Sequence, residues 1–355
     1  NLRFLSRQSK YFYEIGFEDL HPSAVAGSVR GLRHAPYQHR LVELGAEFVR
    51  LAGQETPLWY ASNERLVGKH REAIPERVGY DAIGWTPIMG AEHLELRANV
   101  GMVDWSAAIG PIEVRGAGAL DHLQHLCTVD VDLPIGGLAN TLVLTPSGTV
   151  ARDLTVARIS DDVWWLLTGK GNLPAELASF RAIAPGDGSV SHRDASEEQI
   201  AIGLWGPNSR TVLQSVTDDD VSDASFPWYT HRSIGVGMAP VRAVRVSYLG
   251  ELGWELYVAP SYAAHVWDTL WEAGRDVDMP AVGAQAVFST RIEKGYRLWG
   301  SDLTPEFTPA ESGVAWALDD TKEFRGRQAA RSAPVRRRVR TLRFDREEAV
   351  VYGWE

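Results

Sequence analysis

Two stretches with the pattern of β-hairpins constrain the fold of this chain more than any other feature of its sequence. Apolar runs at 142–144 and 154–156 stand on either side of a Pro-Ser-Gly turn. Runs at 241–247 and 254–258 flank a second turn that contains glycine. A short turn can join only antiparallel neighbours, because parallel strands need a long crossover. The sequence therefore predicts mainly antiparallel sheets.

Helical and strand patterns alternate around these hairpins, so we expect an α+β fold. Strands are predicted at 112–115 and 163–167, and helices at 116–127, after Pro260 and at 284–295. Leu41, Leu44, Phe48 and Leu51 have helical spacing and predict a further helix near 39–51. The Arg-rich segment 335–344 alternates with apolar residues and predicts a strand.

Composition excludes several classes of protein. Hydrophobic residues make up 45% of the 355 residues, which argues against wholesale disorder. No apolar run reaches the roughly 18 residues that a membrane span needs. The net charge of −10 gives no support to a nucleic-acid partner, whose binding surface would be basic. We therefore expect neither a membrane nor a nucleic-acid partner.

Cysteine and histidine usage bears on the compartment and on metals. The single cysteine, Cys127, cannot form a disulfide within the chain or a thiolate zinc cluster. No apolar signal segment follows the first residues, so we expect a cytoplasmic location. His122 and His125 could share a helix face, but no third ligand lies nearby in the sequence. We expect no metal site.

Asp153 is the first candidate for chemistry. It is expected to begin a strand, between Arg152 and an apolar run. An acid desolvated on one side has a raised pKa and suits proton transfer. The structural alternative is an Asp paired with a neighbouring Arg at a turn, and on this segment alone that alternative is favoured.

Glu255 and Tyr248 are candidates for ligand binding on the second hairpin. Glu255 lies between Trp254 and Leu256 on a strand that should be half-buried. Its carboxylate could accept two hydrogen bonds from the edge of a heterocycle, and Tyr248 could cover the ring of the same ligand. The structural alternative is a charged cross-strand pair with aromatic packing.

The segment 290–316 is dense in Gly, Pro, Trp and fixed charges, a composition that is more typical of functional loops. Together with the second hairpin it resembles the aminomethyltransferase family, which includes the glycine-cleavage T-protein. The resemblance is strongest to the folate-binding C-terminal half of sarcosine and dimethylglycine dehydrogenases. The motifs that carry it are the run from Arg291 to Trp299, the Thr-Pro-Glu and Thr-Pro pairs after it, and the Phe-x-Gly-Arg signature at 324–327.

The resemblance implies a cloverleaf fold around a central funnel that holds tetrahydrofolate. Asp153 falls on the family's catalytic Asp, Glu255 on the carboxylate that pairs with the pterin edge, and Tyr248 on the Tyr beside the ring. Four more positions are carried over as cofactor-binding: Leu142, Thr155, Trp316 and Arg291. No metal is implied.

The resemblance also implies domains at 1–62, 63–325 and 326–355. The first would be a linker or the tail of a flavin domain, since 44–48 and 55–60 resemble the exit from that domain. The second would be the folate-binding core, with interwoven subdomains, and the third the start of a truncated β domain. FAD would be a cofactor only where such a flavin domain or subunit is present.

The implied activity is one-carbon transfer to tetrahydrofolate. The carbon would come from the methyl group of an N-methylated amine such as sarcosine or dimethylglycine, would be oxidised by a flavin domain, and would be trapped as 5,10-methylenetetrahydrofolate. An alternative is a stand-alone demethylase that moves an intact methyl group from an O-, N- or S-methyl donor. A folate-binding scaffold without turnover is the third possibility.

Overall fold

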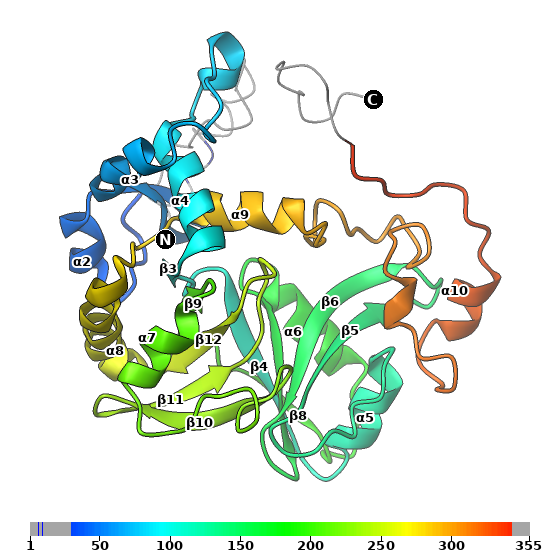
Figure 1. Cartoon of the computed structure of the whole chain (residues 1–355). Helices are drawn as coiled ribbons and strands as arrows, with labels where there is room; N and C mark the ends of the chain where they lie inside the picture. The colour runs from blue at the N-terminus through cyan, green and yellow to red at the C-terminus, as the bar shows by residue number, and fades with distance from the viewer. Residues whose placement is uncertain (1–5, 7–8, 10–29, 343–355) are drawn as a thin grey trace.

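The computed structural model describes residues 6, 9 and 30–342. Two five-stranded antiparallel sheets form its centre, with the orders β10-β11-β12-β9-β3 and β5-β6-β7-β4-β8. Figure 1 shows them side by side, with α7 and α8 beside the first sheet and α9 running across the top. The α+β class with mainly antiparallel sheets is therefore confirmed.

The two sheets are built from β3 (Gly101–Asp104), β4 (Ile109–Arg115), β5 (Leu138–Leu144), β6 (Val150–Arg158), β7 (Val163–Gly169), β8 (Ser191–Asp194), β9 (Ile200–Trp205), β10 (His231–Val236), β11 (Ala239–Val244) and β12 (Gly253–Val258). The main helices are α4 (Pro87–Ala98), α5 (Ala119–Leu126), α6 (Leu173–Ala182), α7 (Ser209–Ser215), α8 (Pro260–Ala273) and α9 (Ala284–Glu293). Both predicted hairpins are present, as β5–β6 and β11–β12.

Strand alternation gives each sheet two different faces. On β12, Trp254, Leu256 and Val258 pack in one core with residues of α7 and α8, while Tyr257 packs in a second core. On β6, Leu154 and Val156 pack against α5 and α6, while Ala157 joins Tyr257 in the second core. This second core therefore contains residues of both sheets, and their inner faces turn toward each other.

The segment before the sheets differs from its prediction. Only the first part of the helix expected near 39–51 forms, as α2 (Gln38–Glu43), and the rest of the prediction is wrong. There β1 (Ala46–Leu51) pairs with β2 (Gln54–Tyr60) as an antiparallel hairpin. Gly45 adopts φ +70°, and a Cβ there would lie 2.9 Å from the Cβ of Ala61. Glycine at this position therefore ends the helix and turns the chain into the strand.

Buried carboxylates tie this segment to the rest of the molecule. The Tyr37 hydroxyl donates to Asp104 at 2.8 Å, and its ring stacks on Trp267 at 4.5 Å. On α4, Glu92 accepts hydrogen bonds from the Tyr60 N–H and from Asn63, at 2.8 and 2.7 Å. Residues 37–63 are thus part of the packed molecule. Short helices follow, α3 (Glu64–Lys69) and the 3-10 turns η1 (Ala61–Asn63) and η2 (Gly79–Ala82).

The C-terminal part of the described chain is mostly irregular. After α9 come the 3-10 turn η4 (Ala315–Ala317) and α10 (Arg327–Ser332), and η3 (Gly274–Val277) follows α8. The strand predicted at 335–344 is absent from 335–342, and its last two residues lie outside the described residues. The backbone N–H groups of Arg336 and Val339 are bonded to Glu311 instead, so side-chain and loop contacts replace a sheet partner.

Within the described residues, no helix is both long enough and apolar enough to cross a membrane.

Candidate functional site

Asp153 lies on the inner face of the second sheet. It is the fourth residue of β6, not the first as predicted, and it stands opposite Leu142 of β5. It is half-buried, and burial raises the pKa of its carboxyl to about 6. Arg152 points to the other face of the sheet, where it pairs with Glu176 at 2.6 Å. The Asp–Arg pair that was the structural alternative for Asp153 is therefore not formed.

Glu255 lies on the inner face of the first sheet and is almost completely buried, with 3% of its surface exposed. The Tyr257 hydroxyl donates to its Oε2 at 2.6 Å. Burial raises the pKa of Glu255 to about 7, although Tyr257 and Trp105 each lower it. In the described chain the Trp105 indole N–H is buried and makes no hydrogen bond of ordinary geometry. A buried acid with one hydrogen-bond donor, Tyr257, therefore lies beside a buried indole N–H that makes no such bond.

Tyr248 connects the two acids. Its ring centroid lies 6.1 Å from that of Trp105, which lies beside Glu255. Burial raises the pKa of the Tyr248 hydroxyl, and the charges of Arg291 and Asp153 are near enough to act on it. The side chains between Glu255 and Asp153 are thus mainly the aromatic rings of Trp105 and Tyr248. Aromatic rings of this kind pack well against the flat faces of a heterocycle.

Leu142 and Thr155 lie on the same face as Asp153, because Leu142 is its cross-strand partner and Thr155 follows two residues later. Leu142 is buried in a small core with Leu303. Thr155 donates to Asn140 at 2.7 Å. The structure therefore groups these two predicted residues with Asp153.

Arg291 and Trp316 lie differently. Arg291 on α9 is buried, donates to the carboxylate of Asp302 at 2.6 Å and to the Tyr296 carbonyl at 3.0 Å, and so fixes the loop after α9. Trp316 on η4 is 71% exposed and makes no ring contact with the residues near Glu255 in the described chain. The roles assigned to both remain predictions.

Two residues of the site were missing from the prediction. Tyr257 could have been found, because it follows Glu255 by two residues on one strand and must share its face. Trp105 could not, since it directly follows β3 and reaches Glu255 only through sheet pairing across β9. Gly203 of β9 stands opposite Glu255, and a Cβ there would lie 2.1 Å from the Trp205 ring. Glycine thus makes room for that ring, which meets Trp105 edge-on at 5.4 Å.

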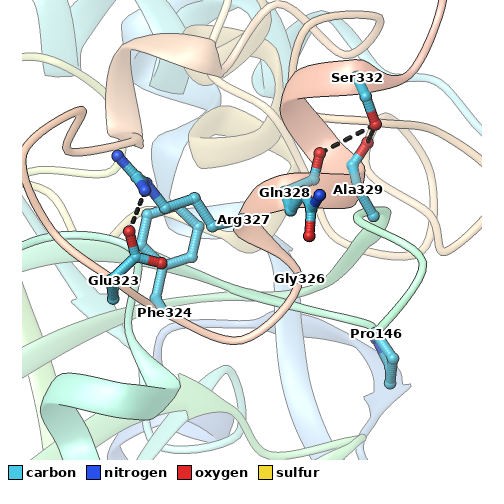
Figure 2. A pocket seen from close by; sticks show the side chains of 8 residues that line it. All are labelled: Pro146, Glu323, Phe324, Gly326, Arg327, Gln328, Ala329 and Ser332. Carbon is cyan, nitrogen blue, oxygen red and sulfur yellow. Dashed lines mark hydrogen bonds and ion pairs between the residues drawn. The ribbon is translucent and has the colours of Figure 1, made fainter.

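Two cavities lie away from this group. One of about 430 Å³ opens beside α10, and Figure 2 shows its charged Arg327 already paired with Glu323. The other, of about 180 Å³, lies on the outer face of the second sheet.

Among the residues described, no three His, Cys, Asp or Glu side chains gather as a metal ion would require. His122 is buried, and its ring packs against that of His192.

Comparison with known proteins identifies the family. A family model described as the GCVT N-terminal domain matches residues 37–322. The chain belongs to the GCVT aminomethyltransferase family. The match begins within the segment predicted as a linker. The domain boundaries themselves remain predictions.

Relatives of this aminomethyltransferase-family chain fall into two groups. Dimethylglycine dehydrogenase of Rattus norvegicus, a mitochondrial protein, is 31% identical over 82% of this chain, which spans only 33% of that relative. An aminomethyltransferase of Halothermothrix orenii is 31% identical over 78% of this chain and 75% of its own length. The glycine cleavage aminomethyltransferase T of Bartonella henselae shares the fold, with a TM-score of 0.69 at 24% identity over 84% of this chain and 74% of its own.

Proposed function

We propose that this chain is a tetrahydrofolate-dependent one-carbon transferase. It would accept the methyl-derived carbon of an N-methylated amine, of the sarcosine or dimethylglycine kind, as 5,10-methylenetetrahydrofolate. The observation that carries the proposal is that the buried acid Glu255 and the half-buried acid Asp153 lie on facing sheets, with Trp105 and Tyr248 between them. Tetrahydrofolate would supply the nucleophilic nitrogens and a flat pterin with a donor-rich edge.

The residues at the site fit such a ligand. Glu255 has one donor, Tyr257, and its Oε1 accepts no hydrogen bond from the residues described, so it can accept the donors of the pterin edge. Tyr248 would lie against the ring, and Leu142 and Thr155 would line the wall beside Asp153. With burial raising its pKa to about 6, the carboxyl of Asp153 is mostly ionised at neutral pH and can take up the proton released at the reacting nitrogen. Trp316 and Arg291 are kept as outer contacts of the same ligand.

A flavin domain or subunit would oxidise the amine before transfer, with FAD as its cofactor. The similarity to dimethylglycine dehydrogenase supports this partnership. We place the protein in the cytoplasm, although that relative is mitochondrial. The match to an aminomethyltransferase over 75% of its length supports a chain that works without a flavin domain. In this second candidate, such a chain would move an intact methyl group from an O-, N- or S-methyl donor.

Calorimetry with tetrahydrofolate tests the binding site. Glu255→Gln should weaken affinity ten- to a hundredfold, since a hydrogen bond to a charged group contributes about 1.5–3 kcal/mol. Glu92→Gln is the matched control, because Glu92 is equally buried but its oxygens already accept bonds from Tyr60, Asn63 and Gly283. Equal affinity of wild type and Glu255→Gln would overturn the assignment. Formation of 5-methyltetrahydrofolate instead of the methylene product would favour the second candidate.

A further inference from the structure

The cavity of about 180 Å³ lies on the far side of β6 from Asp153. Its floor is a bulge in the β5–β6 pair, where Val143 pairs with Arg152 and Leu144 with Val150, which leaves Ala151 without a partner. Bulges bend a strand and redirect side chains, and they are frequent next to binding sites. Here the bulge places Arg152 at the cavity, facing α6.

A buried acid of α6 lines this cavity. Glu176 has 2% of its surface exposed and lies 2.6 Å from the Arg152 Nε. Burial raises the pKa of Glu176, and the Thr168 side chain and Arg152 both lower it, but neither of its oxygens accepts a hydrogen bond of ordinary geometry from the described residues. A buried carboxylate with open acceptor capacity is costly unless a donor reaches it. The cavity is the direction from which such a donor can arrive.

Two arginines, Arg152 and Arg325, line the same cavity. The Arg152 Cζ lies over the Trp299 ring, 4.4 Å from its centroid, and Nη1 donates to the Ala151 carbonyl at 2.6 Å. The Arg152 Nη2 makes no hydrogen bond or ion pair with any of residues 30–342. The backbone N–H of Arg325 is held by the His125 carbonyl at 2.9 Å. Among residues 30–342, none makes a hydrogen bond or an ion pair with the Arg325 guanidinium. Each arginine thus presents free donors.

The larger cavity beside α10 lacks this combination. Its arginine, Arg327, is already paired with Glu323, and its Ser332 hydroxyl donates to a helix carbonyl (Figure 2). The smaller cavity combines free donors, an open acceptor, and apolar walls from Val143, Leu144, Phe180 and Pro305.

We propose that the cavity formed by Arg152, Glu176 and Arg325 binds a small aliphatic amino acid as its zwitterion. The ammonium group would donate to Glu176, and the carboxylate would accept from Arg325 and the free edge of Arg152. A simple anion meets repulsion from Glu176, and a simple cation meets repulsion from the two arginines. The volume limits the ligand to a few heavy atoms. The proposal stands apart from the folate site, with which it shares no residue.

Calorimetry on the full chain tests whether the cavity binds a zwitterion. The ligands are L-alanine, acetate, which carries only the carboxylate, and methylamine, which carries only the ammonium group. L-alanine should bind at least tenfold more tightly than acetate or methylamine. Arg325→Gln and Glu176→Gln should each weaken L-alanine binding at least tenfold. Arg327→Gln, which removes a neighbouring but already paired arginine, should leave it unchanged.

Folding is checked by a melting curve for each variant. Glu176→Gln breaks a buried ion pair, but Arg325→Gln removes a group without a partner in the described chain and should melt like wild type. Arg325→Gln therefore decides the matter if Glu176→Gln misfolds. The proposal is overturned if acetate binds as tightly as L-alanine, or if Arg325→Gln has no effect on L-alanine binding. Absence of L-alanine binding up to about 50 mM, the range of very weak affinities, also overturns it.

Discussion

Asp153 and Glu255 show what burial does to a carboxyl group. Both have raised pKa values, to about 6 and about 7, because desolvation disfavours the charged form. Their acid character and strand positions were predictable from local sequence. Their relation to each other was not, because it depends on two sheets that come together only in the folded chain.

The pH dependence of turnover tests the role of Asp153. Since the base must be ionised, kcat at saturating tetrahydrofolate should fall as pH drops through about 6. Asp153→Asn should lower kcat by about 10²–10⁴-fold, the usual contribution of a general base. Its affinity for tetrahydrofolate should stay within about threefold of wild type, because binding depends on Glu255. An unchanged acid limb in the variant would show that another group titrates there.

Tyr257 should tune the affinity of the site through Glu255. The phenol hydrogen bond favours the ionised carboxylate, so Tyr257→Phe should raise the pKa of Glu255 above about 7. Tetrahydrofolate affinity rises with pH as Glu255 ionises, and the midpoint of that rise should move to higher pH in the variant. Calorimetry between pH 5.5 and 8.5 in the two proteins measures the midpoints. A midpoint that moves to lower pH would contradict this reasoning.

At the scale of elements, local patterns predicted some structures and missed others. The β5–β6 and β11–β12 hairpins were predictable because each strand pairs with its neighbour in sequence. Leu41, Leu44, Phe48 and Leu51 have helical spacing, yet only Leu41 lies in a helix. Leu44 caps the end of that helix, and Phe48 and Leu51 follow Gly45 in β1. That strand is stabilised by pairing with β2, which the spacing of residues within 39–51 cannot reveal. Tertiary pairing thus overrode local propensity.

The contact of α5 and α6 with β8 should weaken in acid. Burial lowers the pKa of His192 to about 4, and its ring meets His122 edge-on at 5.0 Å. Because the folded pKa is below the unfolded value of about 6.5, the unfolded chain binds more protons between these pH values, and stability falls as pH drops through that window. The part of the lost free energy of unfolding that comes from His192 should be roughly 1–3 kcal/mol.

Denaturant unfolding at pH 7.5 and pH 4.5 measures this loss. His192→Leu should lose less unfolding free energy than wild type between the two pH values. Comparing the two proteins cancels the opposite contributions of Glu92 and Glu255, whose raised pKa values favour the folded state as pH falls from about 7 to about 4.5. Equal losses in both proteins would show that His192 is not a source of acid sensitivity.

At the scale of the whole molecule, the segment before residue 63 is the most informative. Its resemblance to the exit from a flavin domain predicted a linker or tail, and no local pattern in 30–60 indicates which residues it packs against. The partners are Asp104, Trp267 and Glu92, which lie 32 to more than 200 residues away in sequence. Contacts over such separations leave no local pattern. The family match from residue 37 agrees with this packing.

This packing predicts that the segment and the sheets unfold together. Tyr37 is completely buried, stacks on Trp267 and bonds Asp104, so Tyr37→Ala should lower the free energy of unfolding by about 3–5 kcal/mol. Val42→Ala, on the exposed side of the neighbouring helix, should change it by less than about 0.5 kcal/mol. Circular dichroism and tryptophan fluorescence should report one common transition in both variants, shifted down only in Tyr37→Ala. A linker that folds apart from the sheets would instead leave the main transition of Tyr37→Ala where it is in wild type, because the sheets would not depend on that ring.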